Sequence, residues 1–63
     1  MKAPAEPVMS GEGRHVLVVE DDEEFRRLLL SLLRRSGFRA SGAADGEEMR
    51  QLLATMPVDV VLL

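Results

Sequence analysis

The sequence predicts an α/β fold with a parallel sheet, in the order β-α-β-α-β, on the basis of three observations. The candidate strands 15–19 and 59–63 are apolar on both faces over residues 16–19 and 60–63, as strands buried inside a parallel sheet are. Two segments with helical periodicity follow the first of these strands, and a weaker strand candidate separates them. Strands that alternate with helices form right-handed crossovers, which make the strands parallel.

The most informative segment is 15–24, HVLVVEDDEE, in which an apolar run is followed by five consecutive acidic residues. Ligands of open α/β sheets bind in the crevice at the carboxyl ends of the strands, so we expect Glu20 and Asp21 at the rim of a site. Crowded carboxylates repel each other unless a cation lies among them, and such hard oxygen ligands suit Mg²⁺. Glu20 and Asp21 are therefore candidate metal ligands.

The same acids have a second interpretation as an ordinary helix start. Asp and Glu in a first turn cap free N–H groups and complement the helix dipole. We expect Asp22, Glu23 and Glu24 to serve in this way. For Glu20 and Asp21 both interpretations stay open on spacing alone, since closely placed carboxylates can be structural.

The first helix is indicated by apolar residues at the spacing i, i+3, i+4, i+7 and i+8, and Gly37 is expected to end it. Its arginines lie mostly off this stripe, and we expect them to form a solvated face. The stripe consists of Phe25, Leu28, Leu29, Leu32 and Leu33, and the arginines are Arg26, Arg27, Arg34 and Arg35.

A weak strand is expected at 38–43, and a second amphipathic helix follows it. Asp45 is the predicted N-cap, with Glu48 as its capping-box partner, and Pro57 ends the helix. The last strand, 59–63, is wholly apolar after Asp59. The second helix's apolar positions are Met49, Leu52, Leu53 and Met56.

The last strand raises a difficulty at the edge of the sheet. If the second and third strands pair on opposite sides of the first, the third presents an open apolar edge, which natural sheets avoid. The chain also ends on a strand residue, at the rim where the acids lie. We therefore expect residues 15–63 to be the first half of a domain. Residues 1–14 have Pro and Gly among small and polar residues without periodicity, and we expect them to form a flexible tail.

Composition narrows the function classes. A chain of 63 residues forms one domain at most, and it has no Cys for disulfides or thiolate metal sites. The net charge of −3 argues against nucleic acid as a partner of this segment, because phosphate binding needs clustered Lys and Arg. No stretch resembles a signal peptide or a membrane span, so a cytoplasmic protein without membrane contact is the expectation.

The combined pattern resembles the receiver domain of two-component response regulators over residues 15–63. The segments that carry the resemblance are VLVVEDDEEFRRLLLSLLRRSGF, the ADGEEM turn and VDVVLL. The stretch GFRASGAADGEEMRQLL is most similar to the OmpR-like branch, whose members carry a C-terminal winged-helix DNA-binding domain. The resemblance implies an incomplete flavodoxin-like (CheY-like) fold, β-α-β-α-β only.

The resemblance also implies a phosphorelay role rather than an enzyme: a sensor histidine kinase passes a phosphoryl group to an Asp with Mg²⁺ bound. Glu20 and Asp21 match the family's metal-binding acids, with Asp21 the more direct ligand and Glu20 acting partly through water. The family's phosphoacceptor Asp would be the residue after Leu63, and it is absent from this sequence. Asp59 lies at the wrong end of its strand to replace it. In the full-length protein, the resemblance implies transcriptional control, DNA contact only through a C-terminal domain, and possible homodimers.

Two other functions remain as alternatives. A haloacid-dehalogenase-type hydrolase also uses Mg²⁺ and an acid after its first strand, but it requires D-x-D where this chain has E-D-D-E-E. A truncated binding module could instead pair its apolar edge with a kinase or a regulator. A dinucleotide-binding domain is excluded, because the turn after the first strand has carboxylates where such a site needs glycines.

Overall fold

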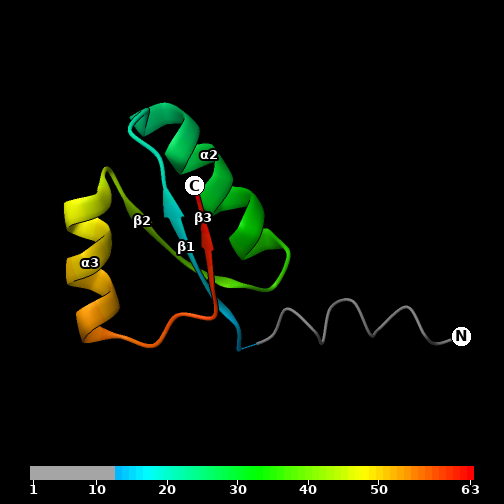
Figure 1. Ribbon diagram of the computed structural model, residues 1–63. Helices are drawn as coiled ribbons and strands as arrows, with labels where there is room; N and C mark the ends of the chain where they lie inside the picture. Colours follow the sequence, from blue (N-terminus) through cyan, green and yellow to red (C-terminus); the bar gives the residue numbers. More distant parts are fainter. Residues whose placement is uncertain (1–12) are drawn as a thin grey trace, which may run out of the picture.

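The computed structural model describes residues 13–63 as a three-stranded parallel sheet with one helix on either side (Figure 1). The predicted order of elements and the flavodoxin-like arrangement are confirmed. The flexible tail predicted for residues 1–14 lies, except for its last two residues, outside the described residues. The elements are β1 (His15–Val19), α2 (Glu23–Arg35), β2 (Arg39–Ala43), α3 (Gly46–Thr55) and β3 (Val60–Leu62).

Strand β1 lies at the centre of the sheet, between β2 and β3. Its middle residues form the core: Leu17 is 0% exposed, Val18 1% and Val16 4%. Ala40 and Ala43 of β2 are also buried. The uninterrupted aliphatic run of β1 therefore matches a strand covered on both faces, as its sequence predicted.

The start and end of α2 follow local sequence signals. The Asp22 carboxylate accepts a hydrogen bond of 3.1 Å from the Phe25 N–H at the first turn. Gly37 has φ 97°, a left-handed conformation that favours glycine, and the next N–H, of Phe38, donates to the Leu33 carbonyl at 3.1 Å. Both predicted helix signals are confirmed. The bond of Phe38 to the helix also explains why β2 begins at Arg39.

The apolar stripe of α2 only partly faces the sheet. Phe25, Leu28 and Leu32 remain 48%, 53% and 46% exposed, and no residue of the helix is fully buried. The half-buried residues instead recur at i, i+3, i+4 and i+7, so the helix is rolled by roughly a quarter turn from the stripe's centre. The half-buried residues are Arg26, Leu29, Leu30 and Leu33.

The prediction of a solvated arginine face is consequently wrong for Arg26, which is half-buried on the sheet side of α2. Arg27 and Arg35 are exposed as predicted. Arg34 is exposed too, although its guanidinium donates a hydrogen bond of 2.7 Å to the Ala40 carbonyl.

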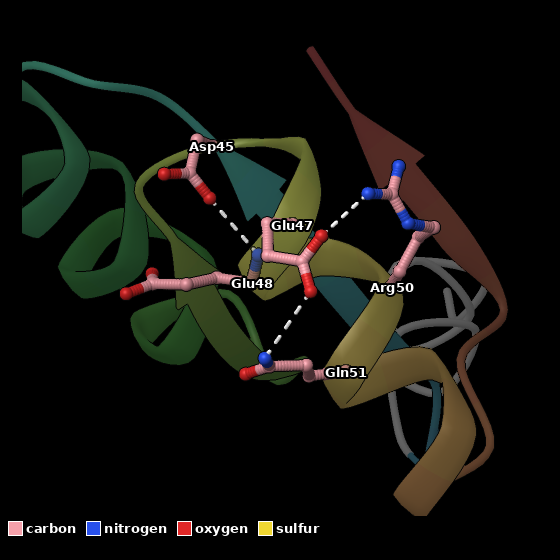
Figure 2. Close-up of polar contacts among 5 residues, drawn as sticks. All are labelled: Asp45, Glu47, Glu48, Arg50 and Gln51. Carbon is pink, nitrogen blue, oxygen red and sulfur yellow. Dashed lines mark hydrogen bonds and ion pairs between the residues drawn. The ribbon is translucent and has the colours of Figure 1, made fainter.

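Helix α3 begins at its predicted N-cap. The Asp45 carboxylate accepts a hydrogen bond of 2.9 Å from the Glu48 N–H, as Figure 2 shows. The capping-box prediction needs one correction, because the Glu48 carboxylate accepts from the Ala44 N–H at 2.7 Å rather than from that of Asp45. The helix ends at Thr55, two residues before Pro57, which cannot continue it.

Strand β3 is the exposed edge that the sequence predicted. Its three residues are 38–43% exposed, and within residues 13–63 neither helix packs against it. In the described part of the chain it pairs only with β1, in the parallel register Val16↔Val60 to Val18↔Leu62. Neither helix of the described segment has the length and apolar character needed to cross a membrane.

Candidate metal site at the carboxyl end of β1

Glu20 and Asp21 directly follow the last residue of β1, at the carboxyl edge of the sheet, as the sequence predicted. The Glu20 N–H donates a hydrogen bond of 3.0 Å to the Ala43 carbonyl, which extends the pairing of β1 with β2 by one residue. Glu20 is half-buried, whereas Asp21 is exposed. The sheet thus holds the backbone of the first acid and presents the second to solvent.

The three acids that open the loop differ in what their carboxylates bind. Glu20 accepts a hydrogen bond of 3.1 Å from the Asp22 N–H, and Asp22 caps α2 through Phe25. The Asp21 carboxylate has no hydrogen-bond or ion-pair partner within residues 13–63. Asp21 therefore has the carboxylate most free to coordinate a ligand.

The donor chemistry of this pair fits Mg²⁺. Both side chains offer hard carboxylate oxygens, and protein sites hold Mg²⁺ through one or two carboxylates together with water and phosphate. No group of three or more His, Cys, Asp or Glu side chains in residues 13–63 could enclose a metal. The pair is thus an incomplete ligand set of the kind that relies on ligands from elsewhere.

Arg26 also contacts this loop, which the sequence interpretation missed. Its Nη1 donates a hydrogen bond of 2.7 Å to the Glu20 carbonyl. This contact could have been predicted from a second periodic set of residues in α2, in which Arg26 shares a face of the helix with Leu29, Leu30 and Leu33. The stripe that includes Phe25 contains more apolar residues, so periodicity favoured that stripe as the buried face.

Asp59 lies at the opposite end of the sheet, as predicted. Its carboxylate accepts a hydrogen bond of 2.8 Å from the His15 N–H, and its own N–H donates to the His15 carbonyl at 2.9 Å. The His15 ring is hydrogen-bonded to the Ser41 hydroxyl at 2.8 Å. Asp59 therefore holds the start of β1 and contributes nothing to the acidic loop.

Comparison with known proteins assigns the family. Residues 16–63 match the family described as "Response regulator receiver domain". The chain is 38% identical over 55 residues to the transcriptional regulatory protein GltR of Pseudomonas aeruginosa, which covers 87% of the chain and 23% of that protein. It is 34% identical over 62 residues to the regulatory protein VirG of Agrobacterium fabrum, covering 97% of the chain and 24% of that protein.

A third relative, the protein PetR of Rhodobacter capsulatus, is 36% identical over 56 residues, covering 89% of the chain and 24% of that protein. No solved structure matches. The chain belongs to the response regulator receiver domain family, which confirms the resemblance seen in the sequence. It spans about a quarter of the length of these curated relatives.

Proposed function

We propose that this chain is the N-terminal part of a phosphorelay receiver that takes a phosphoryl group from a sensor histidine kinase in the cytoplasm. The observation that carries the proposal is the position of Glu20 and Asp21, which extend from the carboxyl end of the central strand in a chain of the receiver family. Asp21, exposed and without a partner among the described residues, is the direct ligand of Mg²⁺. Glu20, half-buried and bonded to the Asp22 N–H, acts partly through water.

The Mg²⁺ ion, when bound, neutralises the charge that develops on the phosphoryl oxygens, and positioning and charge account for most of the catalysis in such transfers. Glu20 and Asp21 would hold the ion at the carboxyl end of β1. In this reaction the protein accepts the phosphoryl group.

We place the phosphoacceptor Asp directly after Leu63 in the complete gene product. If the pairing of Val18 with Leu62 continues by two residues in the same register, the position after Leu63 would lie beside Glu20. Parallel strands end at the same edge, so an Asp there would supply the missing third carboxylate. The length of the relatives, about four times that of this chain, also favours a longer product.

The proposed output is control of transcription. GltR is named a transcriptional regulatory protein and VirG a regulatory protein. We infer that this chain belongs to the OmpR-like branch, in which DNA is bound by a C-terminal domain and the phosphorylated protein forms a homodimer. The net charge of −3 in the present segment agrees with DNA contact lying elsewhere.

The test replaces Asp21 by Asn in the complete gene product. Loss of a carboxylate ligand should weaken Mg²⁺ binding by at least roughly 10- to 100-fold, since even indirect partners of a metal site contribute that much. Phosphorylation by a small phosphodonor should fall in parallel, while the circular dichroism spectrum stays unchanged.

Asp22→Asn is the matched control, because it removes a neighbouring charge and keeps a good N-cap residue. We expect it to retain Mg²⁺ affinity and phosphorylation. Unchanged phosphorylation in Asp21→Asn would show that the metal site is assigned to the wrong residue.

One observation favours a second candidate function, a binding module that acts by association. The edge strand β3 is exposed and apolar, and an extended segment of a kinase or a regulator could pair with it. The intact mass of the product expressed from its own locus separates the two. A mass well above 7.0 kDa, with Asp after Leu63, supports the phosphorelay receiver, and a mass near 7.0 kDa supports the binding module.

A further inference from the structure

Arg26 connects helix α2 to the acidic loop at a single backbone atom. Its side chain leaves the helix on the half-buried face, and Nη1 donates a hydrogen bond of 2.7 Å to the Glu20 carbonyl. That carbonyl belongs to the peptide unit that joins Glu20 to Asp21. Its direction therefore fixes the direction in which Asp21 leaves the strand.

Glu20 is also held by the sheet, through its backbone N–H. The Glu20 N–H donates to the Ala43 carbonyl at 3.0 Å, so both peptide units that flank Glu20 are fixed. The β2 contact orients the peptide before Glu20, and the Arg26 contact orients the peptide after it. Without Arg26, no donor in residues 13–63 would bind the Glu20 carbonyl, and the peptide unit between Glu20 and Asp21 would lose that restraint.

Gly42 provides the space through which the Arg26 side chain passes. A Cβ built on Gly42 would lie 3.1 Å from Arg26 Cδ, 3.2 Å from Arg26 Cγ and 3.1 Å from Leu30 Cδ1. Gly42 does not adopt a positive φ, so its backbone conformation does not require glycine. The missing side chain at Gly42 instead leaves room for the methylenes of the arginine whose Nη1 binds the Glu20 carbonyl.

We propose that Arg26 is a positioning residue that orients the Glu20–Asp21 carboxylates for Mg²⁺, with Gly42 as its supporting contact. This inference rests on the proposed function, because it assigns a residue to the metal site proposed there. Arg26 touches neither the ion nor the phosphoryl group; it acts through the Glu20 carbonyl.

The experiment measures Mg²⁺ affinity in the complete gene product by NMR titration of the Glu20 and Asp21 amides, with unfolding followed separately by urea. Arg26→Met keeps the methylene contact with Gly42 and removes the donor. We expect the affinity of the folded protein for Mg²⁺ to fall roughly 10- to 100-fold, as for other residues that orient metal ligands. Arg26→Lys keeps a donor of similar reach and should recover part of the affinity.

Gly42→Ala tests the same path without changing Arg26. Its methyl group displaces the arginine methylenes, and the affinity should fall in the same direction. Arg27→Met is the matched control, because Arg27 is exposed and among residues 13–63 pairs only with Glu23, so this variant should bind Mg²⁺ as the wild type does.

The outcomes separate this inference from the proposed function. Wild-type affinity in Arg26→Met, or an affinity loss explained wholly by the unfolded fraction, overturns the role of Arg26 and leaves the metal site standing. A wild-type protein that binds no Mg²⁺, or binds it independently of Asp21, overturns both. Loss in Arg26→Met and Gly42→Ala with partial recovery in Arg26→Lys supports the inference.

Discussion

Asp21 and Asp22 are adjacent in the sequence but differ in role: Asp21 is a candidate metal ligand, and Asp22 caps a helix. Asp22 caps α2 through the Phe25 N–H, as Asp45 caps α3 through the Glu48 N–H. Asp21 has no such partner among the described residues. Composition alone treats these carboxylates as equivalent, and the hydrogen bond to the first turn distinguishes them.

The cap at Asp45 gives a prediction for stability. Asp45→Ala leaves the Glu48 N–H without its acceptor, so the free energy of unfolding of the complete gene product should fall by about 0.5–2 kcal/mol. Urea denaturation measures this loss, and Asp45→Asn should restore most of it.

Arg50→Gln is the control for that measurement. It breaks the exposed ion pair with Glu47 in the same helix, drawn in Figure 2, and should change the free energy of unfolding by less than about 0.5 kcal/mol. If this change cost as much as Asp45→Ala, the helix would owe its stability to surface charge rather than to its cap.

At the scale of elements, α2 has two overlapping sets of residues with helical spacing, and packing on the sheet determines which set is buried. The set that starts at Phe25 is wholly apolar, whereas the set that starts at Arg26 includes a charged residue. Sequence periodicity favours the first. The structure places the second toward the sheet, because Arg26 binds the Glu20 carbonyl and Leu30 packs beside Gly42.

The edge strand β3 leads to a prediction about association. Exposed, apolar edges pair with other strands, so a peptide of residues 1–63 should self-associate. Val61→Lys places a charge on that edge and should shift the peptide toward monomer in sedimentation velocity. The matched change Ala54→Lys, on the exposed side of α3, should leave the association unchanged. Equal effects of the two changes would point to general charge repulsion instead of edge pairing.

At the scale of the whole molecule, the buried core of residues 13–63 is small. Its buried apolar side chains come only from β1 and β2, while the apolar residues of β3 and one stripe of α2 remain exposed. A chain of this size buries only about 60% of its unfolded surface even when well packed. The described segment thus leaves much apolar surface for further chain or a partner to cover.

The small core predicts the thermal behaviour. The peptide of residues 1–63 should show no sharp, reversible unfolding transition as a monomer, whereas the complete gene product should unfold cooperatively. Differential scanning calorimetry at several concentrations distinguishes these cases. A cooperative, concentration-independent transition of the peptide would contradict the view that the edge must be covered.

The sequence by itself determined the order of the elements, both N-caps, the glycine that ends α2 and the position of Glu20 and Asp21 after the first strand. These features depend on residues close together in the chain, so periodicity and capping chemistry are sufficient to predict them. Only the tertiary structure decided the roll of α2 and the fixing of the acidic loop by Arg26 and Ala43. The physical reason is that these features arise where α2 and β2 pack on β1, and packing between segments distant in sequence can override the more apolar face of a helix.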